Sequence, residues 1–182
     1  MQCDLGIDLH TAAAQRNNVP QIRANLDDPA TLELARAFGA PFIIDARLRD
    51  GSVRAAATKR GIKVLLFEGG QTLRFNEEVI ETGVNGVLRV LGAMGMGTWE
   101  TPSHPEPIEV RSTRWVRARS AGLMRLDVAL GDRVEKGDIL GAISDALGNR
   151  STQIKASSSG HVIAVNQNPL VTQGAALVHL TG

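Results

Sequence analysis

The 182-residue sequence is poor in aromatic residues and carries almost no net charge. Aromatic residues make up 3% of the chain and tyrosine is absent, so a surface that stacks nucleic-acid bases would have little to use. Twenty Lys plus Arg against nineteen Asp plus Glu give a net charge of +1, without a basic or acidic tail. These absences argue against a nucleic-acid partner. The hydrophobic content of 43% can support a packed core and argues against disorder.

Cysteine and long apolar runs are equally scarce. Cys3 is the single cysteine, so no internal disulfide can form, as is usual in a reducing compartment. The N-terminus has no positively charged flank before an apolar run, and no stretch reaches the ~18 apolar residues of a membrane helix. We therefore expect a cytoplasmic protein with no membrane partner.

The first half of the sequence alternates strand and helix signals. Residues 3–10 alternate apolar and polar side chains, which predicts a strand with Asp8 and His10 on one face. Further elements are predicted in the order helix, strand, helix, strand and helix, over residues 28–39, 41–45, 52–60, 62–67 and from 76 onward. The last helix carries one predicted apolar stripe, formed by Val79, Ile80, Val84, Val87, Leu88 and Leu91. This order is typical of an α/β domain.

Glycine and proline then interrupt the pattern, and the last third of the chain has only strand and turn signals. We place an α/β domain at 1–96, a linker at 97–107 and a β domain at 108–182. The segment Val134–Leu140 is repeated at Val171–Leu177, an offset of 171 − 134 = 37 residues, with glycine at the same position in both. Neither half could bury its apolar face alone, so two similar β units are expected to pack together.

Two side chains stand at the carboxyl ends of predicted strands, where α/β sheets build their sites. His10 closes the first strand, and Glu68 follows the strand at 62–67, just before a pair of glycines. The Glu68 carboxylate could act as a general base, or it could simply cap the next loop. Asp8 could orient the His10 imidazole, although a purely structural histidine is the alternative. The chain contains no local metal-binding pair such as HExxH, and a zinc site needs about three protein ligands.

Arginines are the candidates for binding a substrate carboxylate. Four of them are expected in loops or at a helix start after predicted strands, namely Arg16, Arg23, Arg49 and Arg54. A guanidinium group can hold a carboxylate through two hydrogen bonds. The alternative is that these arginines are solvated.

Three ordered motifs give the sequence a family likeness. They are Asp8-Leu-His10-Thr-Ala, Asn18-Val-Pro-Gln-Ile-Arg23 and Phe67-Glu68-Gly69-Gly70, followed by a helix, a linker and a β domain. Over nearly the whole chain, this set resembles the succinylglutamate desuccinylase/aspartoacylase family of zinc carboxypeptidase-like amidohydrolases. The resemblance implies an α/β fold with a partial zinc-carboxypeptidase-like parallel or mixed sheet and helices. A small, all-β, barrel-sandwich-like domain would follow it.

The resemblance also implies an activity, the hydrolysis of an N-acyl amide on an N-acyl amino acid or a related small molecule. His10 would correspond to the last zinc ligand, Glu68 to the carboxylate that activates the zinc-bound water, and Arg54 to an arginine that binds the substrate's carboxylate. Asp8 would support His10 from behind. The family's other two zinc ligands come from an upstream His-x-x-Glu motif that this sequence lacks. We therefore expect the C-terminal part of such an enzyme, binding zinc weakly and inactive alone; a homo-oligomer is compatible with it.

Two other classes of function remain open. One is a binding or assembly module without catalysis, which would explain the missing ligands. The other is a swinging-arm carrier, because the Val-x-x-Gly repeat of the β domain also resembles biotinyl and lipoyl domains. The apex where such domains hold their modified lysine reads Asp145–Asn149 here and contains no lysine, which argues against a carrier.

Overall fold

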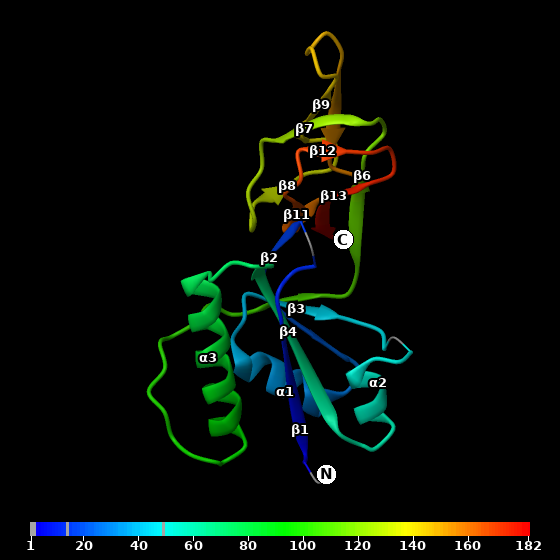
Figure 1. Ribbon diagram of the computed structural model, residues 1–182. Coiled ribbons are helices and arrows are strands. Elements are labelled where there is room, and N and C mark those ends of the chain that lie inside the picture. The colour runs from blue at the N-terminus through cyan, green and yellow to red at the C-terminus, as the bar shows by residue number, and fades with distance from the viewer. Residues whose placement is uncertain (1–2, 14, 49) are drawn as a thin grey trace. The chain divides into compact units, whose positions relative to one another are not determined.

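The computed structural model describes residues 3–13, 15–48 and 50–182, which form two compact units (Figure 1). The first unit contains the chain up to Thr11 and Pro20–Arg111, and the second contains Ala12–Val19 and Ser112–Gly182. The segment 97–107, which the sequence analysis treats as a linker, belongs to the first unit. Arg89 holds this segment, because its guanidinium donates to the Pro102 carbonyl at 2.8 Å and to the Thr101 hydroxyl at 3.2 Å.

The first unit is built on a largely parallel sheet with strand order β1-β4-β2-β3-β5. Its strands are β1 (Leu5–His10), β2 (Arg16–Ala24), β3 (Phe42–Asp45), β4 (Lys63–Gln71) and β5 (Ile108–Val110). β1 runs parallel to β4, and β3 runs parallel to both β2 and β5. The three residues of β5, which the sequence analysis assigns to the β domain, therefore pair inside the first unit.

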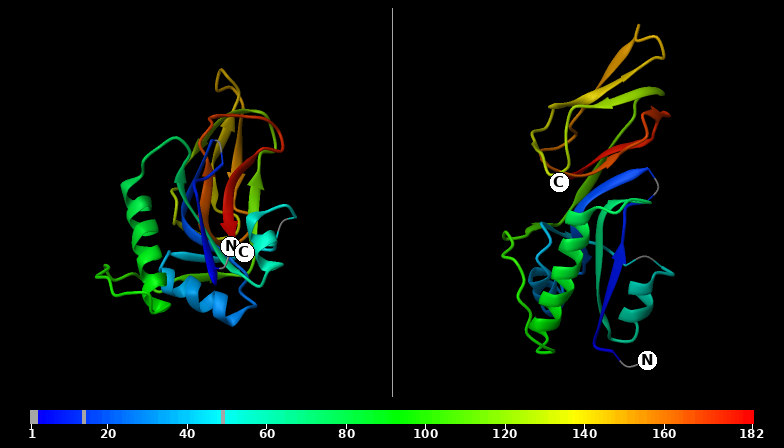
Figure 2. Two further views of the ribbon diagram at one scale, coloured as in Figure 1. Left: turned by 60° about the horizontal axis from the view of Figure 1, so that its bottom comes forward. Right: turned by 60° about the vertical axis from the view of Figure 1, so that its left-hand side comes forward.

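Three helices accompany this sheet: α1 (Pro29–Phe38), α2 (Val53–Thr58) and α3 (Glu77–Ala93). Figure 2 shows α3 and α2 on opposite sides of the strands. α1 begins where the Asp28 side chain accepts the Thr31 N–H, and it ends at Gly39, whose φ of 77° is left-handed. All five predicted elements after the first strand are thus confirmed in type and order. No helix in the described part of the chain is long and apolar enough to cross a membrane.

The core of the first unit forms where α1 and α3 meet the sheet. The Phe38 ring of α1 stacks on Phe67 of β4 with 5.2 Å between ring centroids. Gly86 lets α3 pack closely against the Phe38 ring, because a Cβ atom at this position would lie 2.2 Å from that ring. The helix therefore packs through its glycines. Its buried residues are Gly83, Gly86 and Val90.

Two local predictions differ from the structure. Arg16 and Arg23 were expected in loops, but both lie on strand β2. Asparagines and Pro20 favour a loop locally, yet Ile22 is fully buried between β4 and β3, and this burial overrides the local preference. The predicted apolar stripe of α3 is also only partly buried, since Ile80 and Val84 are 43% and 54% exposed.

The second unit consists of two sheets that share one hydrophobic core. One contains the start of β2 followed by β11, β13 and β6, with β8 paired to β11, and the other has the order β10-β9-β7-β12. The strands are β6 (Thr113–Arg117), β7 (Gly122–Leu126), β8 (Arg133–Val134), β9 (Ile139–Ser144), β10 (Ser151–Lys155), β11 (Gly160–Asn166), β12 (Leu170–Val171) and β13 (Ala176–Thr181).

The sequence repeat is a structural duplication of four strands, with β6–β9 matching β10–β13. Gly122 and Gly160 open the second strand of each copy, 160 − 122 = 38 residues apart, and Gly137 and Gly174 form the same positive-φ turn. The copies exchange pairing partners, because β8 pairs with β11 while β12 pairs with β7. The prediction that two similar β units pack together is confirmed. The described strands do not close into a barrel, and the barrel-sandwich likeness stays a prediction.

Candidate active site

His10 and Glu68 lie side by side on two adjacent parallel strands, His10 as the last residue of β1 and Glu68 within β4. The prediction that the strand ends before Glu68 was wrong, because β4 continues through both glycines to Gln71. The register of β1 and β4 pairs His10 with Glu68 and Asp8 with Leu66. Paired residues of neighbouring strands point to the same face of a sheet, so the imidazole and the carboxylate share one face. Ile7 and Phe67, at alternate positions of the two strands, point the other way, into the core with α1 and α3. The structure therefore brings together the two side chains that the sequence singles out.

Asp8 fixes the His10 ring through the nitrogen that faces it. The distance from His10 Nε2 to Asp8 Oδ1 is 2.9 Å, and the two side chains are 46% and 28% exposed. An imidazole whose Nε2–H is bound by a carboxylate keeps its lone pair on Nδ1. A carboxylate behind a histidine is also the usual partner of a metal-binding imidazole. The predicted same-face placement of Asp8 and His10 is thus present. The lone pair of Nδ1 would be the one that binds a metal ion.

Arg23 is the neighbour of Glu68 that the sequence analysis did not connect with it. Arg23 Nε lies 3.2 Å from Glu68 Oε2, and both side chains are 22% exposed. The contact arises because β2 lies next to β4 in the sheet. Sequence spacing offers no signal for this neighbourhood, since 68 − 23 = 45 residues separate the two side chains. Glu68 is therefore flanked by an imidazole on one strand and a guanidinium on the other.

Arg54 occupies a different part of the first unit. Its side chain is buried, and its guanidinium donates to the Ala46 and Arg47 carbonyls at 3.2 Å each. It borders a cavity of about 260 Å³ together with Lys63, the first residue of β4. Lys63 and Glu68 are 68 − 63 = 5 positions apart, about 16 Å along a strand. The structure places Arg54 near the amino end of β4, with Glu68 near the carboxyl end.

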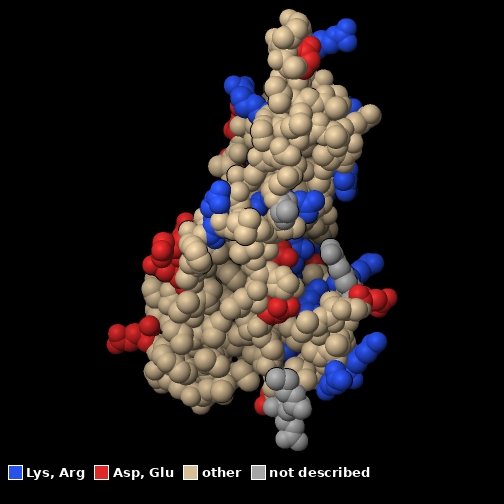
Figure 3. Space-filling model, viewed as in Figure 1, with Lys and Arg blue, Asp and Glu red and all other residues tan. Residues whose placement is uncertain are grey.

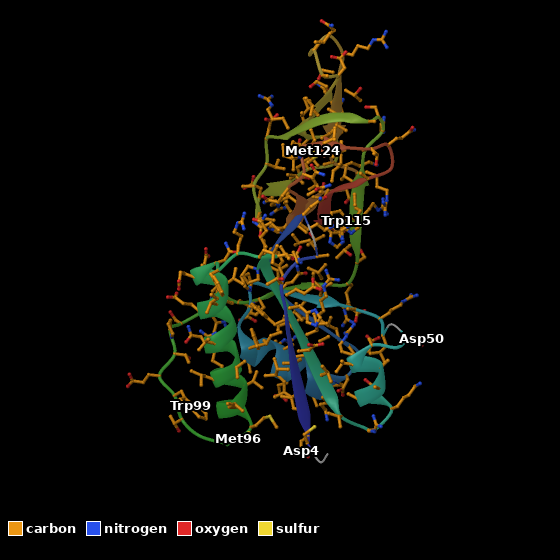
Figure 4. The ribbon with its side chains drawn as sticks, viewed as in Figure 1. Asp4, Asp50, Met96, Trp99, Trp115 and Met124 are labelled. Carbon is orange, nitrogen blue, oxygen red and sulfur yellow. The ribbon has the colours of Figure 1, made fainter. Side chains whose placement is uncertain are left out.

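The other candidate arginines and histidines have contacts elsewhere. In the second unit, the Arg16 guanidinium lies 4.8 Å from the centre of the Trp115 ring, which stacks on His179; Figure 4 labels Trp115 on β6. His104 has its Nδ1 atom 3.0 Å from the Pro105 carbonyl. Arg49 lies outside the described residues. Within residues 3–13, 15–48 and 50–182, no group of three or more His, Cys, Asp or Glu side chains could hold a metal ion.

Comparison with known proteins identifies the family of this chain. The model of the succinylglutamate desuccinylase/aspartoacylase catalytic domain matches residues 1–94, more than half of the chain. The chain belongs to this family. The family prediction made from the three motifs is therefore confirmed, and the mixed sheet with few helices agrees with the family's fold.

Three similar proteins are related to this chain in sequence or in fold. The N-alpha-acetyl-L-2,4-diaminobutyric acid deacetylase of Halomonas elongata is 27% identical over 154 residues, covering 78% of this chain and 45% of the deacetylase. A solved succinylglutamate desuccinylase/aspartoacylase from Rhodobacter sphaeroides is 26% identical with a TM-score of 0.86, covering 98% of this chain and 58% of that protein. The ectoine utilization protein EutE (DoeB) from Ruegeria pomeroyi shares the fold at 22% identity and a TM-score of 0.86, covering 98% and 60%. The chain thus spans about half the length of its relatives.

Proposed function

We propose that this chain forms part of a zinc-dependent amidohydrolase that removes the acyl group from an N-acyl amino acid or a related small molecule. The observation that carries the proposal is the pairing of His10, the last residue of β1, with Glu68 of β4 on one face of the sheet. Family membership and the deacetylase name of the Halomonas elongata relative support the reaction class.

His10 would hold the zinc ion through Nδ1, because Asp8 occupies its Nε2. The described residues fit one ligand position of such a site, an imidazole with its supporting carboxylate. When bound, zinc would polarise the scissile carbonyl and lower the pKa of a bound water. Two further ligands are required to complete a three-ligand site. We attribute them to a His-x-x-Glu motif in the half of the relatives that this chain does not span.

Glu68 would act as the general base. Its carboxylate would take a proton from the attacking water and pass it to the amine that leaves when the amide bond breaks. Arg23, 3.2 Å from Glu68 Oε2, would restrict the carboxylate and keep its other oxygen directed at the site. A base that is fixed in position loses less entropy in the transition state than a freely rotating one.

By the family resemblance Arg54 would bind the substrate's carboxylate, although its guanidinium lies near the amino end of β4 and Glu68 lies near the carboxyl end. Its two hydrogen bonds to the Ala46 and Arg47 carbonyls support a second contribution, which is to hold the loop after β3 in place. Removal of the guanidinium would therefore disturb the loop as well as any bound carboxylate. Arg54→Lys should keep the charge and lose the paired geometry, so it would raise KM more than it lowers kcat.

The test is hydrolysis by a completed protein. The 182 residues are joined to the part of the Halomonas elongata deacetylase that the match does not cover, and amine release from N-acetylated and N-succinylated amino acids is measured with and without zinc. We expect zinc-dependent hydrolysis, reduced roughly 100-fold or more by Glu68→Gln. The chain alone should bind zinc weakly and hydrolyse nothing measurable.

Two results would contradict this proposal. Hydrolysis by the 182 residues alone would show that they contain a complete site. A joined protein that folds but binds no zinc would instead favour the alternative, a binding or assembly module without catalysis. The lack of a three-ligand cluster among the described residues is the observation in favour of that alternative.

A further inference from the structure

The cavity beside Arg54 lies away from the pair formed by His10 and Glu68. It has a volume of about 260 Å³, and all of its described lining residues belong to the first unit. Lys63, which lines it at the amino end of β4, is about 16 Å along the strand from Glu68. The carboxylate of an N-acyl amino acid lies within about 4 Å of its amide nitrogen. A substrate whose amide bond is at Glu68 therefore cannot place its carboxylate in this cavity.

Positive charge predominates in this cavity. Arg54 is 7% exposed, and the Ala46 and Arg47 carbonyls fix its guanidinium, so it contributes a charge that cannot move away. Lys63 adds a second positive charge, and its ammonium group forms no ion pair with another residue in the described part of the chain. Asp28 is the single acidic residue among the described lining residues. The lining therefore has a net charge of 2 − 1 = +1.

The polar groups of the lining are mostly hydrogen-bond donors. The carboxylate of Asp28 already accepts the N–H and the hydroxyl of Thr31. This hydrogen bond lowers the pKa of Asp28 most, and the nearby charge of Lys63 lowers it further. The side-chain oxygen of Asn25 accepts a backbone N–H at 3.2 Å, which leaves its amide nitrogen as a donor, and the Thr58 hydroxyl can also donate. A ligand that fits these groups is negatively charged and accepts hydrogen bonds.

We propose that this cavity binds a small oxyanion, either phosphate or the carboxylate of a small acid. Lys63 would pair with the anion, while the Asn25 amide and the Thr58 hydroxyl would donate hydrogen bonds to its oxygens. Asn25 and Thr58 are exposed, so the anion can enter from solvent. Figure 3 shows further Lys and Arg side chains over α2, so positive charge extends beyond the cavity. Such a site is separate from the proposed hydrolytic site and does not require that the chain takes part in amide hydrolysis.

The test titrates inorganic phosphate, acetate and chloride, at equal ionic strength, into the ¹⁵N-labelled 182-residue chain. We expect saturable shifts of the Asn25, Thr58 and Lys63 amides with phosphate or acetate and none with chloride, and the tighter of the two oxyanions identifies the chemical source. Lys63→Gln should weaken this binding roughly tenfold or more. Lys59→Gln is the matched control, because it removes the same charge from an exposed residue at the end of α2 that is outside the lining. It should leave the binding nearly unchanged.

A variant with the opposite expected effect makes the test sharper. Asp28→Asn keeps a hydrogen-bond acceptor for the start of α1 and removes the negative charge of the lining, so it should tighten oxyanion binding roughly threefold or more.

Three outcomes would overturn the oxyanion site. These are the absence of saturable shifts with both oxyanions, equal weakening by the Lys63 and Lys59 substitutions, and weaker binding by Asp28→Asn. Zinc titration of a separate, phosphate-free sample distinguishes this site from the proposed function. Oxyanion binding in a chain whose His10 does not respond to zinc would contradict the proposed function alone. A zinc response at His10 without oxyanion binding would contradict the oxyanion site alone.

Discussion

The two units bury their apolar residues in different ways. In the second unit, two four-strand copies exchange pairing partners, and both sheets contribute to one core. Leu140 and Leu177, at matching positions of the repeat, are both fully buried. In the first unit, the core under Phe38 is equally tight, but the edge at β1 and the outer stripe of α3 stay uncovered. A duplicated unit can complete its own core, whereas the described part of the first unit leaves one sheet edge and one stripe of a helix exposed.

The largest expected effect tests the equivalence of the two β copies. Leu140→Ala and Leu177→Ala each remove a fully buried side chain and should each cost about 2–5 kcal/mol of unfolding free energy. Urea titration measures both, with the exposed Leu147→Ala as the control that should stay near zero. If one of the two substitutions were tolerated, the copies would not share the core equally.

The next effect tests the packing of the first unit. Gly86→Ala places a methyl group in the Phe38 ring, so it should destabilise the protein by about 1–3 kcal/mol despite the better helix propensity of alanine. Gly92→Ala on the same helix is the control, because its nearest neighbour is 3.7 Å away. Thermal unfolding followed by circular dichroism measures both. Equal stabilities would contradict the close approach of α3 to Phe38.

A smaller effect concerns the start of α1. The Thr31 hydroxyl, which donates to Asp28, lowers the pKa of Asp28 below its ordinary value. Because the folded-state pKa is the lower one, the cap stabilises the protein fully above the unfolded-state pKa and loses this contribution as the pH falls through the folded-state pKa. Asp28→Ala should cost about 1 kcal/mol at pH 7.

A variant without the ionisable group at residue 28 is the control for the pH dependence of this cap. Asp28→Asn keeps a hydrogen-bond acceptor without an ionisable group, so the difference between wild type and this variant should shrink as the pH is lowered below about 4. Urea titrations at pH 7 and at pH 3 measure it. A difference that grew on acidification would contradict the lowered pKa.

The smallest expected effect concerns the uncovered surface of the first unit. Val84→Lys changes a side chain that is 54% exposed, so the free energy of unfolding of the chain alone should shift by no more than about 0.5 kcal/mol. Val90→Lys, at a fully buried position of the same helix, should be far more damaging. If both substitutions were equally costly in urea titrations, the outer stripe of α3 would already be packed in the isolated chain.

Sequence reasoning reached the helices, most strands of the first unit and the pairing of His10 with Glu68, because these rest on local periodicity and strand ends. It missed β2, since Asn17, Asn18 and Pro20 favour a loop and only burial between other strands makes this segment extended. The Arg23–Glu68 contact could not be predicted either, because it depends on the order of the strands in the sheet. The repeat, in contrast, was visible in the sequence, because each copy needs a glycine at the same turn.

The proposed zinc site depends most directly on which nitrogen of His10 can bind a metal ion. Long-range ¹H–¹⁵N correlation spectra of the imidazoles, recorded on this chain during a zinc titration, report the tautomer and the site of binding. We predict a proton on His10 Nε2, held by Asp8, and a zinc-dependent shift at Nδ1 that Asp8→Asn weakens. Zinc shifts confined to His104 or His161, or a His10 that carries its proton on Nδ1, would contradict the proposed site.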